Sequence, residues 1–416
     1  MESGHYKKYI RIPPGVSIDV RNILPIINHP LFQRLLHVGQ LGTTLSVFPG
    51  ATHNRFEHAL GVYHKTRNFC QRLITDYILN HKEALNISLF GLLHDIGHGP
   101  FSHVIEELTP YDHDKNGARI IKSLKTAITK SGGDYNFILT LFNRKNSLYR
   151  IVMDRNIGTD KLDYLERDTY HTGFGQRPDV ETILDYSTFM DGNMVIDKKA
   201  LEAAKQIQRL YIYMYKEVYL HKSTLISQRF MQKIIARLIL KEKIKPPDLW
   251  KMNDHQIMAR IFLSEDAVLR WQYQALVERN LPRTGLVVRL KSRRIRERIA
   301  GKNIKVVGED VNFFEKFAKR NSPANLEKLE SQISKIIGAD SFKIVIVPIL
   351  NPWRFEPQDI VYHDNGEVMS LKKTHKEYFE SMKSELEDYL AVRVCIIGDR
   401  NLIFENADKI MSVLKK

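Results

Sequence analysis

The pattern of apolar and polar positions divides the chain into two parts of different texture. Between about residues 30 and 275, apolar side chains recur at spacings of three and four residues, and short loops are marked by glycine and proline. This spacing is typical of amphipathic helices. The longest helical segments are predicted at residues 56–79, 84–97 and 203–240.

After about residue 282 the pattern changes to short apolar runs separated by turn residues, which is typical of strands. The predicted segments are strands at 285–290, 342–350 and 393–397, a hairpin at 361–369 around Asp364-Asn365-Gly366, and helices at 324–337 and 375–390. We therefore predict a mainly α protein, with a helical domain at residues 1–281 and a smaller α+β domain at residues 282–416.

The composition is that of a globular protein, because 43% of the 416 residues are hydrophobic and 27% are charged. The two cysteines, Cys70 and Cys395, lie far apart without CxxC spacing, which argues against a disulfide framework or a zinc finger. No apolar run is long enough for a signal sequence or a membrane span. We therefore expect a cytoplasmic protein with no membrane partner.

A formal net charge of +15 predicts an anionic partner, which could be a nucleotide, a nucleic acid or a lipid headgroup surface. The densest basic run covers residues 289–298 and is followed by Lys302 and Lys305. Two interpretations of this run stay open: a solvated face and a phosphate-binding surface.

The histidines are clustered, since ten of the sixteen fall between His29 and His113. His94 and Asp95 are adjacent near the end of an apolar helix, where burial would require a partner for both side chains. A divalent metal would be such a partner, and a mixed His/Asp set favours Mn, Mg, Fe, Zn or Co. His58, one helix earlier, is a further candidate ligand.

Asp160, from a distant helix, would complete the set of four ligands. We expect Gly97 to cap the helix that carries His94. The site would then lie at a helix end that faces a cleft.

The order of these residues resembles the HD-domain phosphohydrolases, whose signature is a single His, an adjacent His-Asp pair and a distal Asp. Four longer segments resemble the deoxynucleoside triphosphate triphosphohydrolase branch of that family: residues 48–58, 94–103, 160–168 and 219–222. The resemblance implies an HD-domain helical core, and metal-dependent hydrolysis of a deoxynucleoside triphosphate to a deoxynucleoside and inorganic triphosphate. It covers about residues 33–222, and no sterile-alpha-motif domain is expected.

The resemblance also implies roles for individual residues. The metal ligands would be His58, His94, Asp95 and Asp160; the catalytic group would be His103 as general acid, oriented by Glu106, with His98 and His113. The substrate-binding residues would be Arg55, Lys161 and Tyr164 for phosphate, Gln40, Leu41 and Asp168 around the sugar 3′ hydroxyl, and Tyr219 against the sugar ring.

The sequence departs from the family pattern at two places. Tyr211 stands where relatives carry an arginine that grips the triphosphate tail, which leaves open a phosphatase or phosphodiesterase that acts on shorter or other nucleotides. Asn28 and Leu36 stand where a mammalian relative recognises an activating guanine nucleotide, so another activator, or none, is open.

Two further expectations concern binding partners. The high net charge keeps open a third function, a nucleic-acid-binding regulatory module on the same scaffold, and weak nucleic-acid binding is open even for an enzyme. The resemblance implies a homo-oligomer, either a dimer or a tetramer.

Overall fold

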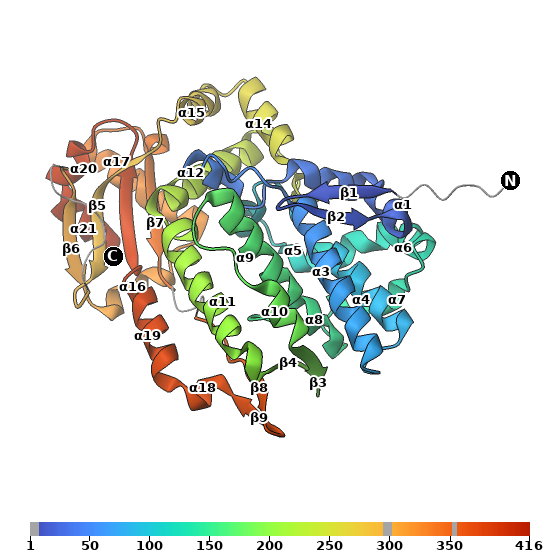
Figure 1. The fold of residues 1–416 in the computed structure, drawn as a ribbon. Helices are drawn as coiled ribbons and strands as arrows, with labels where there is room; N and C mark the ends of the chain where they lie inside the picture. Colours follow the sequence, from blue (N-terminus) through green and yellow to red (C-terminus); the bar gives the residue numbers. More distant parts are fainter. Residues whose placement is uncertain (1–7, 294–301, 352–355) are drawn as a thin grey trace. The chain divides into compact units, whose positions relative to one another are not determined.

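The computed structural model describes residues 8–293, 302–351 and 356–416 (Figure 1). The chain forms two compact units, each assembled from several segments. Unit 1 comprises residues 1–214, 246–254 and 357–378, and unit 2 comprises residues 215–245, 255–356 and 379–416. The two units interleave along the sequence, and a single domain boundary after residue 281 stays a prediction.

Unit 1 consists mainly of helices, as the three- and four-residue spacing predicts. Its α-helices are α1 (Leu24–Ile27), α2 (Pro30–Gln33), α3 (Arg55–Thr75), α4 (His81–Leu93), α5 (His113–Ile120), α6 (Lys125–Lys130), α7 (Tyr135–Phe142), α8 (Arg150–Met153), α9 (Thr159–Thr172), α10 (Val180–Asp185), α11 (Leu201–Met214), α13 (Pro246–Leu249) and α18 (Leu371–Thr374). The predicted mainly α class, with a smaller α+β region, is confirmed.

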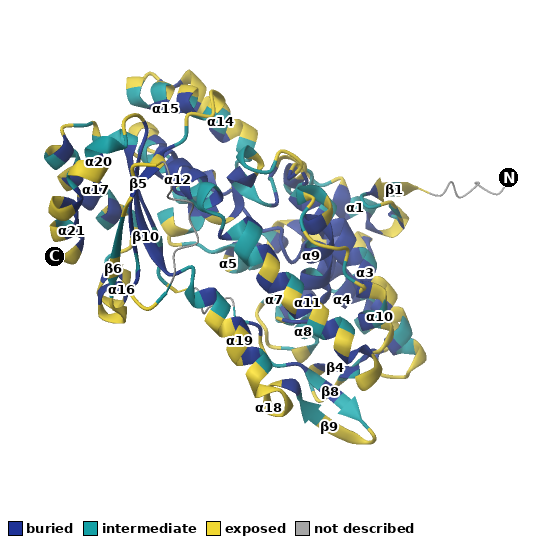
Figure 2. Ribbon diagram, turned by 60° about the vertical axis from the view of Figure 1, so that its left-hand side comes forward, coloured by how far each residue is buried: buried dark blue, intermediate teal, exposed yellow. Residues whose placement is uncertain are grey.

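Helices α3 and α4 begin at side-chain caps and form the centre of unit 1. The Asn54 side chain accepts a hydrogen bond from the backbone N–H of Glu57, and Asn80 and Glu83 form a reciprocal capping box. Gly61 of α3 allows α9 to approach closely, because a Cβ there would lie 2.1 Å from a carboxylate oxygen of Asp163. Figure 2 shows the buried interior of these helices in dark blue.

The expectation that Gly97 caps the preceding helix is wrong. Helix α4 ends at Leu93, and Gly97 does not adopt a positive φ angle. A Cβ at Gly97 would instead lie 2.0 Å from the carbonyl oxygen of His113 and 2.4 Å from the backbone nitrogen of Gly117. The glycine is therefore explained by close packing against α5.

Two small sheets complete unit 1. Strands β1 (Tyr9–Ile12) and β2 (Val16–Asp19) form a hairpin, and the second sheet has the order β3 (Ser187–Met190), β4 (Asn193–Asp197), β8 (Val361–Asp364) and β9 (Glu367–Ser370). The β8–β9 hairpin was predicted at 361–369. It pairs in parallel with β4, so a late segment of the chain returns to unit 1.

Unit 2 contains a four-stranded sheet of the order β6 (Lys305–Glu309), β5 (Arg283–Leu290), β10 (Ala391–Ile396) and β7 (Ile344–Ile349). Its helices are α12 (Lys222–Glu242), α14 (Asp254–Leu263), α15 (Ala267–Val277), α16 (Val311–Ala318), α17 (Pro323–Ile337), α19 (Lys376–Glu387), α20 (Asn401–Glu405) and α21 (Ala407–Lys415), of which α14 and α19 begin within unit 1. Apolar residues of the sheet form one core with α16, α17, α20 and α21.

The predicted helix at 203–240 is interrupted. Helix α11 ends at Met214, one turn of π-helix covers Tyr215–Tyr219, and α12 begins at Lys222. The apolar spacing continues through this interruption, so periodicity alone could not locate it.

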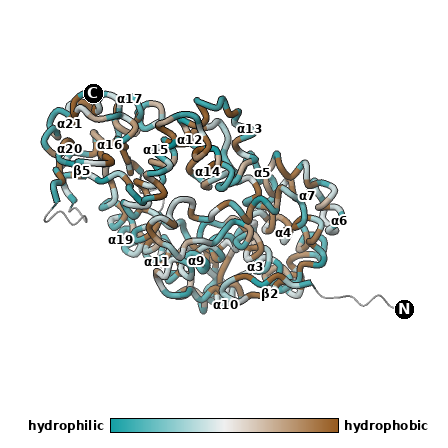
Figure 3. Tube along the Cα trace, turned by 90° about the horizontal axis from the view of Figure 1, so that it is seen from above, coloured by the Kyte–Doolittle hydropathy of each residue, from teal (hydrophilic) through white to brown (hydrophobic). Residues whose placement is uncertain are grey.

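Half of the basic run at residues 289–298 lies outside the described residues, because residues 294–298 are not among them. Its phosphate-binding interpretation stays a prediction. Hydrophobic and hydrophilic stretches alternate along the trace in Figure 3, and none of the described helices is long and apolar enough to cross a membrane.

Candidate metal centre and active site

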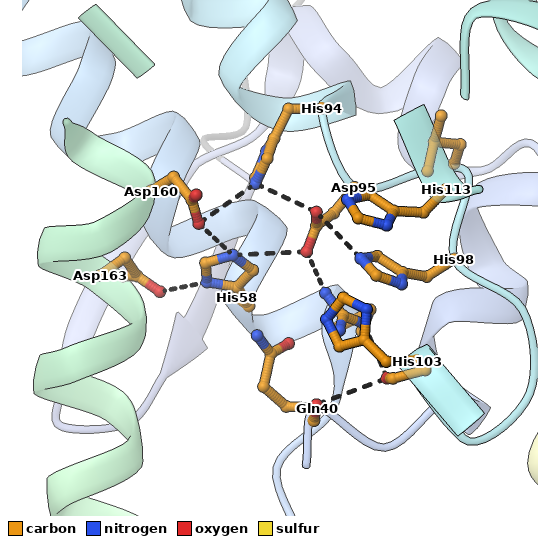
Figure 4. Close-up of polar contacts among 12 residues, drawn as sticks. Gln40, His58, His94, Asp95, His98, His103, His113, Asp160 and Asp163 are labelled. Atoms are coloured by element: carbon orange, nitrogen blue, oxygen red, sulfur yellow. Dashed lines mark hydrogen bonds and ion pairs between the residues drawn. The ribbon is translucent and has the colours of Figure 1, made fainter. Parts of the chain in front are cut away.

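Three helices of unit 1 bring the four predicted metal ligands together (Figure 4). His58 lies on α3, His94 and Asp95 directly follow the last turn of α4, and Asp160 lies in the first turn of α9. The His58 Nε2 atom is 3.2 Å from Asp160 Oδ1 and 3.6 Å from Asp95 Oδ2. The His94 Nε2 atom is 3.4 Å from Asp95 Oδ1 and 3.5 Å from Asp160 Oδ1.

The donor set fits a divalent metal. The Nδ1 atoms of both histidines are hydrogen-bonded outward, to Asp163 from His58 and to the carbonyl of Gly91 from His94. The two Nε2 atoms face the centre, are buried and have no hydrogen-bond partner. Imidazole nitrogen and carboxylate oxygen together suit the borderline and hard divalent ions, and the predicted metal cofactor is confirmed while its identity stays open.

The charges around the centre act strongly on one another. Burial by itself would lower the pKa of His58, but the carboxylates of Asp160 and Asp163 outweigh it and raise this pKa to about 9. Burial would raise the pKa of Asp160, but the neighbouring imidazoles of His58 and His94 lower it to about 2. A bound cation would take the place of the histidine protons.

Arg55 pairs with Asp95, a predicted metal ligand. The guanidinium Nη1 donates to Asp95 Oδ2, and Nε donates to the hydroxyl of Ser102 over 3.0 Å. Burial alone would raise the pKa of Asp95, but the Arg55 charge and neighbouring histidines hold it well below its usual range. The predicted contact of Arg55 with phosphate stays a prediction; in this arrangement Arg55 orients a predicted metal ligand.

A second cluster of imidazoles lies beside the metal ligands. The Glu106 Oε1 atom accepts hydrogen bonds from His103 Nδ1 over 3.0 Å and from His113 Nδ1 over 2.7 Å. The rings of His98 and His113 stack with their centroids 4.1 Å apart, and His98 Nε2 lies 3.4 Å from Asp95 Oδ1. The predicted residues of this group therefore meet at one place.

His103 differs from its neighbours in exposure. Its side chain is 65% exposed, whereas that of His98 is 2% exposed. His103 can therefore reach a bound substrate while its Nδ1–H bond to Glu106 fixes the ring. The pair lies on a 3₁₀ helix, Ser102–Leu108, where side chains three residues apart lie on the same side.

Asp163 contacts a predicted metal ligand and was missed by the sequence analysis. This fully buried carboxylate accepts from His58 Nδ1 over 2.9 Å and is neutralised by Lys65 and Arg167. A hydrogen bond of this kind fixes the orientation and tautomer of a metal-binding histidine. Its sequence signal was its position three residues after Asp160, on the same side of α9.

The predicted substrate-binding residues of unit 1 lie at different places. Gln40 is buried beside the second imidazole cluster (Figure 4), and Leu41 follows it in the same loop. Tyr164 lies on α9 one turn after Asp160. Asp168, further along α9, forms a buried pair with His53, whose Nε2 lies 2.7 Å from Asp168 Oδ1.

Lys161 is held by its neighbours. Its ammonium group donates to the carbonyl of Arg155 over 2.6 Å and lies 3.4 Å from the centre of the Tyr211 ring. Burial lowers the pKa of Lys161 to about 7. The residue that departs from the family pattern, Tyr211, thus contacts the predicted phosphate-binding lysine directly.

Tyr219 belongs to unit 2. It ends the π-helical turn, and its ring packs edge-on against Tyr215 with the centroids 4.9 Å apart. Its predicted contact with a sugar stays a prediction.

Two family models match the chain: the HD domain over residues 55–155 and the HD associated region over residues 179–383. The HD match begins at Arg55 and includes three of the four predicted metal ligands, His58, His94 and Asp95. The chain belongs to the HD-domain phosphohydrolase family. The fold and the metal centre support a metal-dependent hydrolase.

Among the relatives is the deoxynucleoside triphosphate triphosphohydrolase SAMHD1 homolog of Dictyostelium discoideum, which is 30% identical over 273 residues, or 60% of this chain and 51% of that protein. An uncharacterized protein of Methanocaldococcus jannaschii is 31% identical over 252 residues, or 59% of this chain and 53% of that protein. The chain thus spans about half the length of these relatives.

Two solved structures share the fold. A phosphohydrolase from Bacteroides thetaiotaomicron superposes with a TM-score of 0.71 at 21% identity and covers 94% of this chain and 100% of its own. A hypothetical protein from Aquifex aeolicus has a TM-score of 0.70 at 23% identity, with 97% and 100% covered. At these identities the likeness concerns the fold alone.

Proposed function

We propose that the protein hydrolyses deoxynucleoside triphosphates to deoxynucleosides and inorganic triphosphate. The observation that carries the proposal is the direct contact between the four-ligand metal centre and the imidazole cluster, through Asp95 and His98. The triphosphohydrolase named among the relatives, at 30% identity, points to the same substrate class.

Different residues would bind the metal, donate a proton and bind the phosphates. His58, His94, Asp95 and Asp160 would hold the metal, which when bound supplies Lewis-acid charge and acidifies a coordinated water. His103 is the group placed to give a proton to the departing 5′ oxygen, since it is exposed and Glu106 orients it. The basic side chains of Arg55 and Lys161 would attract the phosphate oxygens.

A second function has one specific observation in its favour. The Lys161 ammonium group is occupied by the Tyr211 ring and the Arg155 carbonyl, in a place where relatives have a further guanidinium for the tail. An enzyme with fewer cations to bind the triphosphate tail would favour a nucleotide with a shorter phosphate chain. We therefore keep a nucleotide phosphatase or phosphodiesterase as the alternative.

Product analysis separates the two functions. Metal-stripped protein is resupplied singly with Mn, Mg, Co, Fe or Zn and incubated with each deoxynucleoside and ribonucleoside triphosphate and monophosphate. Products are identified by ion-exchange chromatography, and the Asp95→Ala variant is the control for a contaminating activity.

We expect a deoxynucleoside and intact triphosphate, both absent with the variant. Release of phosphate from shorter nucleotides would reject the triphosphohydrolase in favour of the alternative. No turnover with any metal or nucleotide mixture, together with salt-dependent binding of RNA or DNA, would favour a nucleic-acid-binding module.

The assembly and location are part of the same proposal. We propose a cytoplasmic homo-oligomer, a dimer or a tetramer, whose activation by a nucleotide is tested by adding each nucleotide in turn to the assay. Light scattering coupled to gel filtration gives the number of subunits, and a monomer at assay concentration would reject an obligate oligomer.

A further inference from the structure

The Asp254 carboxylate joins two loops that lie far apart in the sequence. Its Oδ2 atom accepts a hydrogen bond from the backbone N–H of Gly39 over 2.9 Å, and its Oδ1 atom accepts from the backbone N–H of Phe101 over 2.7 Å. Asp254 is the last residue of a short segment, residues 246–254, by which the chain returns to unit 1.

Each of these two amides lies next to residues of the candidate site. Gly39 directly precedes Gln40 and Leu41, the residues expected around the sugar. Phe101 lies between His98 and His103. The Asp254 carboxylate therefore fixes the distance between two loops. One carries Gln40 and Leu41, and the other carries His98 and the expected general acid His103.

The backbone of the second loop needs such support. Phe101 and Ser102 both have positive φ angles, 55° and 54°. This left-handed region is unfavourable for residues with a Cβ, and two such residues in succession persist only when surrounding contacts enforce them. The Asp254 bond acts directly on the first of the two.

Other contacts tie the same loops together. The Ser102 hydroxyl donates to the carbonyl of Gly39 over 2.8 Å and accepts from Arg55 Nε. The buried Arg34 guanidinium donates to the carbonyl of His98 over 2.6 Å and to that of Met252, two residues before Asp254, over 3.1 Å. Residues 246–254 are thus tied to the strained loop at two points: at Phe101 directly through Asp254, and at His98 through Arg34.

We propose that Asp254 is a positioning residue for the hydrolytic reaction: it sets the geometry between the substrate-reading loop at Gln40 and the acid loop at His103. The proposal rests on the proposed function, because it assigns both loops to one reaction. The two Asp254 bonds described above go to backbone amides and not to the predicted metal ligands, so we expect its loss to leave metal binding intact.

The test compares Asp254→Asn and Asp254→Ala with the wild-type protein. Asparagine keeps the size but has one acceptor oxygen for two amides, and alanine removes both acceptors. Asp248→Asn and Asp248→Ala are matched controls in the same segment, because the Asp248 side chain is 57% exposed and only contacts Lys251 at 3.5 Å among the ion pairs of the described residues.

Three quantities are measured for each variant: deoxynucleoside triphosphate turnover with the metal that supports it, bound metal, and backbone hydrogen exchange resolved by peptide. We expect exchange at residues 38–46 and 97–104 to accelerate about tenfold or more in Asp254→Ala, and less in Asp254→Asn. Turnover should fall about 10- to 100-fold, since small displacements of reacting groups cost rates of this size. Metal content and exchange in α3 and α4 should match the wild type.

Unchanged loop exchange and turnover in Asp254→Ala would overturn the proposal. So would a loss of metal or of protection throughout unit 1 in both variants, because Asp254 would then support the fold in general. If the wild-type protein turns over no nucleotide, the proposed function fails, and the exchange data decide separately whether Asp254 holds the two loops.

Discussion

At the scale of the residue, each of three predicted metal ligands is held in place by a hydrogen bond to another residue. His58 is held by Asp163, His94 by a main-chain carbonyl and Asp95 by Arg55. Each bond leaves the metal-facing atom in place and fixes its direction. Residue type and order predicted four candidate ligands, which the structure brings together. Their partners could not be predicted, since Arg55 and Asp95 are 40 residues apart and His58 and Asp163 are 105 apart.

Replacing Asp163 with asparagine should weaken metal binding. An amide oxygen still accepts from His58 but carries no charge, and Lys65 and Arg167 lose the carboxylate that neutralises them. We expect the dissociation constant for the metal to rise about 10- to 100-fold. Equilibrium dialysis against buffered metal measures it. The exposed Asp191→Asn change is the control, and equal affinities for the two variants would contradict the role.

The pH dependence of His113 follows from Glu106. Burial alone would lower the pKa of His113, but the Glu106 hydrogen bond outweighs it, so the pKa lies above the ordinary value of 6.5. The folded state therefore binds this proton more tightly, and the resulting stability is complete below pH 6.5 and is lost as the pH rises through the folded pKa.

We expect Glu106→Gln to lower the pKa of His113 in the metal-free protein. Histidine C2 hydrogen exchange followed by mass spectrometry gives the pKa in both proteins. The exposed Glu181→Gln change should leave it as in the wild type. A His113 pKa that does not change in Glu106→Gln would show that this hydrogen bond is not its cause.

At the scale of the element, close helix packing places the ligands. Helix α9 brings Asp160 and Asp163 to His58 because α3 has no side chain at Gly61. A similar absence of a side chain at Gly97 lets the turn after α4 approach α5. Local pattern predicted the helices well, but it assigned Gly97 to a helix cap, because a glycine required by packing and one required by conformation look alike in sequence.

Gly61→Ala should destabilise unit 1 despite the better helix propensity of alanine. The propensity gain is about 1 kcal/mol, but the new Cβ would lie 2.1 Å from Asp163 and 2.3 Å from Arg167, both buried and bonded. We expect a net loss of about 1–3 kcal/mol, measured by urea unfolding followed by helix signal.

Gly117→Ala is the matched helical control for this change. Its Cβ would meet the edge of the Phe142 ring at 3.0 Å, which a side-chain shift can relieve. We expect a smaller loss than for Gly61→Ala. An unchanged or higher stability of Gly61→Ala would show that α3 and α9 can separate without cost.

At the scale of the whole molecule, the predicted metal ligands all belong to unit 1, although the chain passes between the two units several times. The β8–β9 hairpin returns to pair with β4, and residues 246–254 return to the site loops. Binding energy at the metal centre is therefore expected to stabilise unit 1 first. A ligand at 100 times its dissociation constant contributes about 2.7 kcal/mol to the state that binds it.

Metal should thus slow hydrogen exchange unequally in the two units. We expect peptides of α4 in unit 1 to exchange up to about 100-fold more slowly with saturating metal, and peptides of β10 in unit 2 to change little. His94→Ala should abolish the effect. Equal protection of both units would show that they open as one, contrary to this expectation.

The sequence by itself determined the local elements and the chemical type of the site. Spacing, caps and turn residues act over a few positions, so the helices at 56–79 and 324–337, the hairpin at 361–369 and the strand at 285–290 could be predicted close to their observed bounds. The ordered set of His58, His94, Asp95 and Asp160 indicated a divalent metal before any geometry was known.

Only the tertiary structure decided which residues, distant in sequence, contact the predicted metal ligands and the loops of the candidate site. The bonds from His58 to Asp163 and from Phe101 to Asp254, and the contact of Lys161 with Tyr211, join residues separated by 50 to 153 positions. No periodicity connects such pairs. They arise because buried charges and amides must find partners wherever close packing of helices and loops brings them together.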